Sequence, residues 1–186
     1  MRAPRRSKRL VGERVELRRH DRANYPLYAR WYGDNEIWHL TSWTSQPMQR
    51  AAVERLFEER EKSSADDSFA IHRRGEDRPI GVIGLSNIGR ADASADLSVI
   101  LGEAEARDQG LGTEAIRLIL SYAFEDLGLN SVALSVFDFN EAAIHTYENL
   151  GFEREGRMRE AIRRDDGFHD AILMRILASA WSEDGA

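Results

Sequence analysis

Two glycines that open a helix are the feature that most constrains this chain. The segment Arg107-Asp-Gln-Gly110-Leu-Gly112-Thr113 places both glycines directly before an apolar repeat of helical spacing. Glycine adopts the backbone conformations of a tight turn, and the first N–H groups of a helix have no partner within that helix. Because the helix dipole is positive at this end, such a turn favours a phosphate group. The sequence therefore predicts an anion-binding turn supported by a helix.

The residues after this turn predict a helix, a strand and a second helix. Apolar residues at helical spacing indicate that the first helix runs to Gly128: Ala115, Ile116, Ile119, Leu120, Ala123 and Leu127. The short apolar run Val132–Phe137 is typical of a buried strand. Asn140 has the position of an N-cap for the second helix, which is expected to end at Gly151, before an apolar strand that begins at Phe152. Tyr147 follows Asn140 by about two turns, so both side chains are expected on one face, about 10 Å apart.

The rest of the chain predicts a mixed α/β domain. The expected strands are Leu10–Leu17 with a turn or bulge at Gly12, Asp67–Arg73, Ile80–Ile88, Ser94–Leu101 and Phe168–Leu177, while helices are expected from Asp21 or Asn24 to Tyr32 and from Pro47 to about Lys62. Gly81 and Gly84 indicate a bulge or the close approach of another backbone. The segment Asp34–Trp43 is aromatic but lacks regular periodicity, so we expect a loop of a kind that often carries binding residues. Trp38 and Trp43 are interpreted as core or loop-anchoring residues.

Size and composition favour one domain. The chain has 186 residues, of which 42% are hydrophobic, and this is enough for one sizeable core. Residues 1–8 are expected to form a flexible basic arm, residues 9–178 the domain and residues 179–186 a tail. With no cysteine in the sequence, disulfides and thiolate metal sites are excluded, and the five histidines do not have metal-site spacing. No apolar run is long enough to span a bilayer and no signal peptide is visible, so a cytoplasmic protein without a metal is expected.

Charge is distributed unevenly along the chain. Residues 1–22 contain nine Lys or Arg and three Asp or Glu, which leaves 17 basic and 29 acidic residues in the remainder. An acidic body attracts cations and repels nucleic acid. The composition therefore favours a cationic amine over DNA as a partner, although most of these carboxylates are expected simply to keep the surface soluble.

Two nucleotide sites compete as explanations of the glycine turn. A triphosphate-binding loop is excluded because no Gly-Lys-Ser/Thr follows the glycines. A dinucleotide fingerprint fits Gly110-Leu-Gly112-Thr-Glu-Ala115, with Asp138 as the ribose-binding acid. However, that fingerprint needs a strand running directly into the first glycine, and the polar segment Glu103–Asp108 lies between.

The order of the motifs resembles the GNAT superfamily of acyl-CoA-dependent N-acetyltransferases. Arg107-x-x-Gly110-x-Gly112 matches the pyrophosphate loop of that family, and Asn140-x6-Tyr147-x3-Gly151-Phe matches its second CoA-side motif. The chain looks most similar to the RimJ/RimL-like and spermidine acetyltransferase branches. The resemblance extends from about Leu10 to Leu177. It implies a mostly antiparallel central sheet with splayed middle strands, flanked by helices.

The resemblance also implies acetyl-CoA as cosubstrate and assigns residues to it. These cosubstrate-binding residues are Ile100, Leu101, Gly102, Arg107, Asp108, Gln109, Gly110, Leu111, Gly112, Thr113, Asn140 and Asn149. A backbone N–H near Ile100 or Leu101 is the expected donor to the thioester oxygen, where negative charge develops. A thiol has a pKa near 8.5 and a phenol one near 10, so Tyr147 is expected to protonate the departing thiolate.

The acceptor side is the least specified part of the sequence. By resemblance, Asp34 and Glu36 lie on the loop that covers the acceptor, where a carboxylate or a chain of waters would take the proton of the amine. A polyamine, an aminoglycoside-type amine, an amino sugar and a peptide N-terminus all stay open as acceptors. A homodimer is common in the family. A CoA-binding or partner-binding module without turnover is the alternative function.

Overall fold

The computed structural model describes residues 9–182. Its helices and strands, in chain order, are β1 (Arg9–Val11), β2 (Val15–Arg18), η1 (Arg22–Asn24), α1 (Tyr25–Tyr32), α2 (Asn35–Thr41), α3 (Arg50–Lys62), β3 (Asp67–Arg73), β4 (Pro79–Gly89), β5 (Ser94–Leu101), η2 (Ala104–Ala106), α4 (Leu111–Ser121), η3 (Tyr122–Asp126), β6 (Ser131–Phe137), α5 (Glu141–Asn149), β7 (Glu153–Arg164), β8 (Gly167–Leu177) and η4 (Ala178–Ala180). The basic arm expected over residues 1–8 lies outside the described residues.

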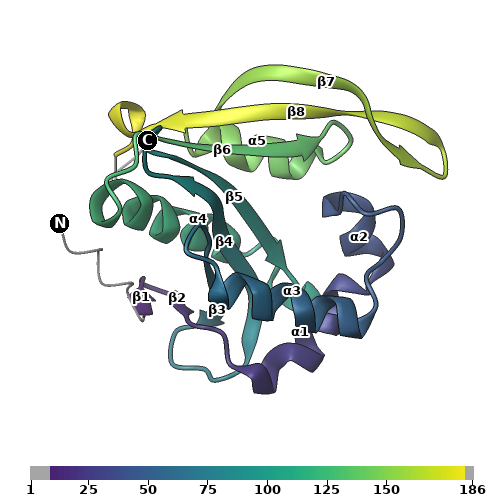
Figure 1. Ribbon diagram of the computed structural model, residues 1–186, viewed down its shortest axis with the longest axis horizontal. Coiled ribbons are helices and arrows are strands. Elements are labelled where there is room, and N and C mark those ends of the chain that lie inside the picture. Colours follow the sequence, from purple (N-terminus) through teal and green to yellow (C-terminus); the bar gives the residue numbers. More distant parts are fainter. Residues whose placement is uncertain (1–8, 183–186) are drawn as a thin grey trace.

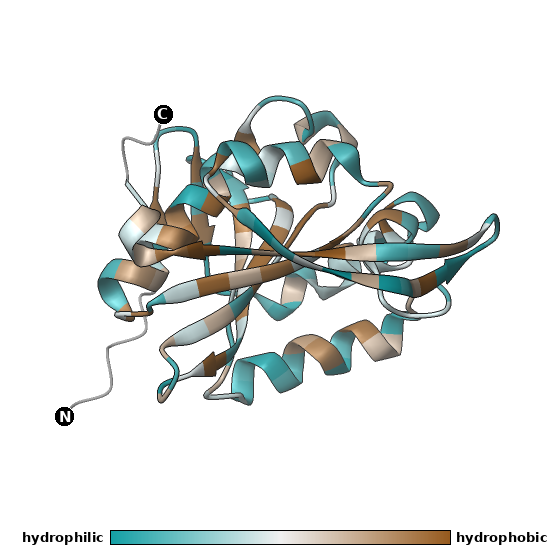
Figure 2. Ribbon diagram, turned by 90° about the horizontal axis from the view of Figure 1, so that it is seen from above, coloured by the Kyte–Doolittle hydropathy of each residue, from teal (hydrophilic) through white to brown (hydrophobic). Residues whose placement is uncertain are grey.

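The strands form one mixed sheet of order β1-β2-β3-β4-β5-β6-β8-β7. All neighbouring strands are antiparallel except β5 and β6, which are parallel. Helices lie on both sides of the sheet (Figure 2). This arrangement confirms the expected fold class: a mixed α/β domain with a mostly antiparallel sheet.

The parallel pair at the centre of the sheet is short. β5 and β6 are paired only from Ser94–Asp96 to Ser131–Ala133. Beyond these residues the two strands separate, as Figure 1 shows. The remaining backbone of β5 therefore has no strand on its β6 side. The splayed middle strands are thus as expected.

The hydrophobic core lies on both faces of the sheet. One cluster joins the strands to α4 and α5, and it includes Ile116, Ile119 and Ile144. A second cluster joins the opposite face to α1 and α3, and it is centred on Tyr28, Trp31 and Phe57. These apolar contacts hold the helices in place around the site where β5 and β6 separate.

Local signals predicted several elements well. β3 and β5 have the expected bounds, and Gly33 follows α1 as its C-cap. Gly128 and Gly151 have φ angles of 67° and 94°, the left-handed conformation expected after a helix.

Two expectations about the N-terminal half were wrong, and a third was partly right. A turn was expected at Gly12, and there the Gly12 N–H bonds to the Val15 carbonyl, which makes a hairpin of β1 and β2 in place of one interrupted strand. The loop expected over residues 34–43 contains α2, because the Asp34 carboxylate caps its first turn. α3 begins only at Arg50, rather than at Pro47 as expected.

The C-terminal part also differs from expectation. β7 is largely exposed and charged, rather than an apolar strand starting at Phe152, and with β8 it forms a long hairpin (Figure 1). In the tail, η4 is followed by Trp181, whose ring packs 6.1 Å from that of Phe124. Part of the tail is therefore attached to the domain.

Candidate functional site

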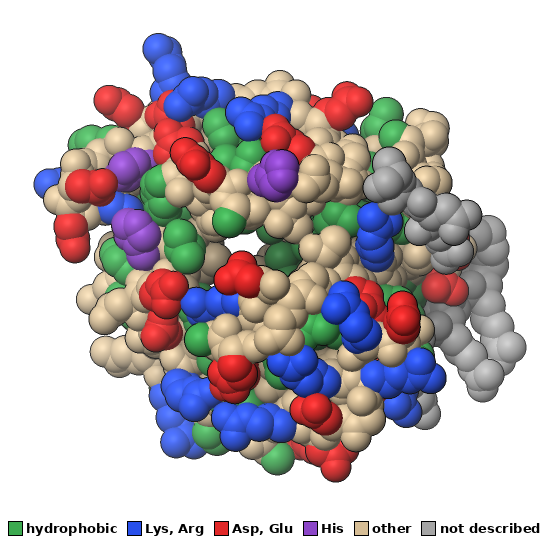
Figure 3. All heavy atoms as spheres, turned by 180° about the vertical axis from the view of Figure 1, so that it is seen from behind, with side chains coloured by type: hydrophobic (Ala, Val, Ile, Leu, Met, Phe, Trp, Pro, Cys, Tyr) green, Lys and Arg blue, Asp and Glu red, His purple; other side chains and the backbone are tan. Residues whose placement is uncertain are grey.

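A cavity of about 640 Å³ lies where β5 and β6 separate. Its wall includes Leu97, Ser98, Val99 and Ile100 of β5, Ala133–Phe137 of β6, Asn140, Ala143 and Tyr147 near or in α5, Leu173–Arg175 of β8, and Tyr32, Ile37, Trp38, Trp43, Leu56 and Arg60 from the helical side. Seen from behind, the molecule has a hollow at its centre (Figure 3). The volume is within the range of small-molecule sites.

The free edge of β5 supplies backbone donors to this cavity. The Gly102 N–H bonds to the Ile80 carbonyl of β4 at 2.9 Å. Residues of an antiparallel strand alternate in the direction of their N–H groups, so Ile100 also faces β4, whereas Val99 and Leu101 face the open side. Leu101 therefore suits the predicted carbonyl-binding role better than Ile100. The Gly102 amide is committed to β4, and its contact with the cosubstrate stays a prediction.

The glycine turn has the geometry that its sequence requires. Gly110 has φ 73°, and it precedes Leu111, the first residue of α4. A side chain on Gly112 would come within 3.1 Å of Leu101, so the start of α4 packs closely on the end of β5. The first N–H groups of α4, including that of Thr113, lie at the positive end of the helix dipole.

Arginines from distant elements hold the turn. Arg14 donates to the Gln109 carbonyl at 2.9 Å, and Arg73 donates to the Gln109 side-chain oxygen at 3.2 Å. Arg107 forms a 3.1 Å ion pair with Glu36 of α2. The neighbouring Asp108 has φ 56°, a conformation that few non-glycine residues adopt. Arg14 and Arg107 are paired with Glu114 and Glu36, whereas Arg73 forms no ion pair with a carboxylate in residues 9–182, so its guanidinium contributes positive potential that suits a diphosphate.

Asn140 and Tyr147 both reach the cavity, as their spacing predicted. Asn140 caps α5 by accepting from the Ala143 N–H at 3.3 Å, and its amide donates to the carbonyl of Leu40 in the last turn of α2. Tyr147 packs edge-on against Phe152 at 5.7 Å. Desolvation raises the pKa of the Tyr147 phenol to about 12, so the phenol stays protonated at neutral pH.

The remaining predicted residues lie outside the cavity wall. Asp34 accepts a 2.9 Å hydrogen bond from the Ile37 N–H as the cap of α2, and Glu36 is the exposed partner of Arg107. Asn149 is exposed near the end of α5. Roles for Asp34 and Glu36 at the acceptor, and for Asn149 at the cosubstrate, stay predictions.

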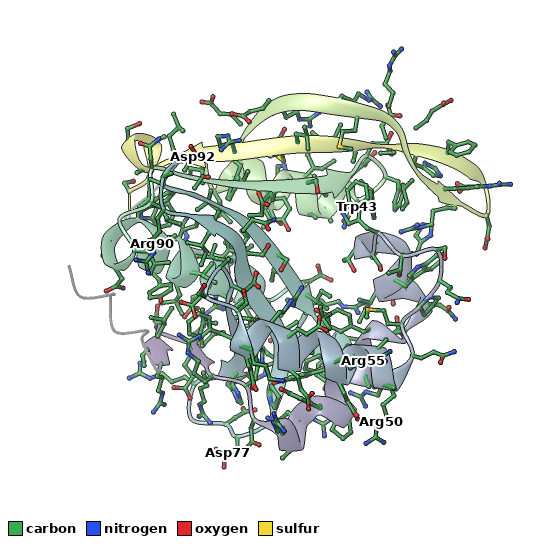
Figure 4. The ribbon with its side chains drawn as sticks, in the orientation of Figure 1. Trp43, Arg50, Arg55, Asp77, Arg90 and Asp92 are labelled. Carbon is green, nitrogen blue, oxygen red and sulfur yellow. The ribbon has the colours of Figure 1, made fainter. Side chains whose placement is uncertain are left out.

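Several residues of the cavity were missed by sequence reasoning. Val99 presents a free N–H, and Asp96 lies on the same strand, exposed although it is in the middle of the sheet. The alternation in Ser94–Leu101 was a usable signal, because Asp96 and Ser98 are polar residues on one face of a central strand. Trp38 and Trp43, interpreted as core or anchoring residues, line the cavity, and Trp43 lies between α2 and β6 (Figure 4).

Comparison with known proteins identifies the family. The model of the acetyltransferase (GNAT) domain matches residues 14–153. The chain belongs to the GNAT acetyltransferase family. Its members of this type are acetyl-CoA-dependent N-acetyltransferases. The family match and the relatives confirm the RimJ/RimL-like resemblance seen in the sequence.

Relatives of this GNAT protein have named activities. "Probable N-acetyltransferase YjcK" of Bacillus subtilis is 30% identical over 122 residues, 65% of this chain and 67% of that protein. Spermidine N(1)-acetyltransferase of Escherichia coli is 28% identical over 144 residues, 77% of this chain and 76% of that protein. The crystal structure of spermidine N-acetyltransferase from Vibrio cholerae in complex with CoA and spermine has a TM-score of 0.82 and 25% identity, and covers 90% of this chain and 97% of that one.

Residues 9–182 contain neither a metal-binding cluster nor a membrane-spanning helix. No group of three or more His, Asp or Glu side chains in this part is placed to hold a metal ion. None of the helices in the same range combines the length and apolar character that crossing a membrane requires.

Proposed function

We propose that this GNAT enzyme transfers the acetyl group of acetyl-CoA to a primary amine by direct attack in a ternary complex. The observation that carries the proposal is the open edge of β5, which faces a cavity lined by Tyr147, while the Gly110 turn follows the end of the same strand. The site fits acetyl-CoA in two ways. The extended pantetheine arm can pair with the free edge of β5, and the diphosphate matches the N-terminus of α4 and the arginines beside it.

Groups on β5 and α5 suit the steps of the reaction at the thioester. The N–H groups of Val99 and Leu101 face the open side of β5, where they would stabilise the thioester oxygen as it gains negative charge. The amine attacks the carbonyl carbon in its neutral form, so a carboxylate or a chain of waters first takes the extra proton of the ammonium group, and a second N–H proton leaves by the same route as the C–N bond forms. The C–S bond then breaks and the sulfur leaves as a thiolate. Tyr147, whose phenol is neutral, donates its proton to that sulfur. Asn140 orients the neighbouring wall by joining α5 to the C-terminal end of α2.

The acceptor is proposed to be a primary amine of a small molecule or a peptide N-terminus. The relatives support an amine in general, since one is named for spermidine and another as a ribosomal N-acetyltransferase. A homodimer and a cytoplasmic location belong to the proposal as well. In the alternative, the same cavity binds CoA or a partner without turnover.

Acetyl transfer across an amine panel tests the proposal. CoA release from acetyl-CoA should depend on the amine, and acetyl-CoA should raise the melting temperature of the protein while NAD(P) should not. Stabilisation by acetyl-CoA without acetylation of any amine would favour the binding module. Stabilisation by NAD(P) alone would reject the cosubstrate assignment.

A further inference from the structure

One wall of the cavity carries polar side chains of β5 that have no role in the acetyl transfer described above. On β5, Asp96 and Ser98 alternate with Leu97 and Val99, so they point away from α4 and toward the side of the sheet covered by α1 and α3. Asp96 is level with Ala133 of β6 in the parallel pair. The polar side chains of β5 therefore form the floor of an open groove on the face opposite the helices α4 and α5.

Four charged side chains line the cavity, and two of them neutralise each other. Glu155 of β7 and Arg175 of β8 form an ion pair at 2.8 Å. Because these two side chains already bind each other, a ligand would have to break their ion pair before it could bind either charge. The other two lining charges are Asp96 and Arg60.

Asp96 is held in place but has no counter-charge. The Asn87 amide donates to one oxygen of the Asp96 carboxylate at 2.8 Å. Asn87 itself has φ 51° at an irregularity of β4, which directs its side chain toward β5. Within the described residues, no Lys or Arg pairs with Asp96. A fixed carboxylate with a free oxygen is a suitable partner for an ammonium group.

Arg60 is the complementary group. It lies near the end of α3, half-buried, with its guanidinium 5.7 Å from the ring centroid of Phe57. None of the Asp and Glu side chains in residues 9–182 forms an ion pair with it. A guanidinium group that lines a cavity and stacks on an aromatic ring is arranged to bind a carboxylate or another planar anion.

We infer that Asp96 binds the ammonium group of the acceptor and Arg60 binds an anionic group of the same molecule. The acceptor class is therefore a zwitterionic amine, such as an amino acid, and not a polyamine. This inference rests on the proposed acetyl transfer. The formal charges lining the cavity cancel, whereas a polycation with several ammonium groups requires an excess of carboxylates. The acidic balance of the whole chain does not extend to this cavity.

Matched substrates test the inference directly. Lysine is compared with 1,5-diaminopentane, and phenylalanine with 2-phenylethylamine, since each pair differs only by the carboxylate. The wild type should have a higher kcat/KM for the amino acid of each pair, roughly ten- to hundredfold, as expected for a charge-assisted hydrogen bond. Arg60→Met should remove this preference. Asp96→Asn should raise KM for all four amines and leave KM for acetyl-CoA unchanged.

Two exposed positions provide matched controls. Arg55 is also on α3, and Asp92 precedes β5; both lie at the periphery, outside the cavity wall (Figure 4). Arg55→Met and Asp92→Asn should keep wild-type kinetics. Equal kcat/KM within each pair, or Asp96→Asn and Arg60→Met with wild-type KM values, would overturn the inference while acetyl transfer stands. Absence of transfer to every amine would overturn both.

Discussion

The guanidinium of Arg164 lies 4.4 Å from the ring centroid of Trp38. Arg164 is at the end of β7, and its side chain is buried. It donates to three backbone carbonyls at the end of α2, those of Trp38 at 3.2 Å, His39 at 3.1 Å and Ser42 at 2.7 Å. Burial lowers the pKa of this guanidinium. A cation at a helix C-terminus binds the last carbonyls and is favoured by the helix dipole, so Arg164 holds the cavity wall that carries Trp38 and Trp43.

Replacing Arg164 should loosen this wall. Arg164→Met should lower the free energy of unfolding by about 1.5–3 kcal/mol, because the carbonyls lose a charged donor. It should also raise KM for the amine more than KM for acetyl-CoA, and Arg164→Lys should restore part of both. Thermal unfolding and steady-state kinetics check these effects. Arg163→Met is the control, since Arg163 is exposed on the same strand. Equal changes in both KM values would mean that Arg164 does not act on the amine side.

The ion pair between Glu36 and Arg107 connects α2 to the glycine turn. Glu36→Gln should free the Arg107 guanidinium for a phosphate group. An exposed pair contributes only about 0–1 kcal/mol, so KM for acetyl-CoA should fall by no more than about fivefold. Initial rates at varied concentrations of both substrates check this. A rise in KM for the amine instead would support the acceptor role predicted for Glu36 from the sequence.

Gly110 should be required for the shape of the anion-binding turn. An alanine there would keep φ near 73° only at a cost of about 1–2 kcal/mol, and its Cβ would lie 3.2 Å from the Arg14 guanidinium. Gly110→Ala should therefore weaken acetyl-CoA binding roughly tenfold. Gly128→Ala is the control, because Gly128 has φ 67° with no atom within 4 Å of an added Cβ. Isothermal titration should show weaker binding only for Gly110→Ala. Equal losses in both variants would assign the effect to stability alone.

The raised pKa of Tyr147 sets the pH range in which it can donate a proton. Its donor form is the protonated phenol, which persists below a pKa of about 12. With a lysine-like amine as acceptor, activity should therefore rise with pH as that amine loses its proton near its pKa of about 10.4, with no decline from Tyr147 up to about pH 10. A pH profile of kcat/KM checks this. An alkaline decline near about pH 9 that disappears in Tyr147→Phe would contradict the raised pKa.

Signals between nearby residues predicted the parts of the site formed by one stretch of chain. The glycines of the turn, the Asn140 cap and the spacing of Tyr147 need only a helix and its ends, so the sequence from Gly110 to Gly151 was sufficient. The resemblance to a family then supplied the order of the sheet and the parting of its middle strands.

Contacts between distant residues could not be predicted in this way. α2 has no apolar periodicity, and its C-terminal carbonyls are bound by Arg164, which is more than a hundred positions later in the chain. The exposure of Asp96 depends on the separation of two strands, and the position of Arg60 depends on the packing of α3. These relationships exist only in the folded molecule, and they determine the acceptor side of the cavity.

The central claim is that Tyr147 protonates the sulfur of CoA bound at the free edge of β5. Its most direct test is single-turnover acetyl transfer by Tyr147→Phe, with the dissociation constant of acetyl-CoA measured in parallel. The account predicts a rate lower by about two to four orders of magnitude and a dissociation constant within about twofold of the wild type. A rate equal to that of the wild type at saturating acetyl-CoA would contradict it.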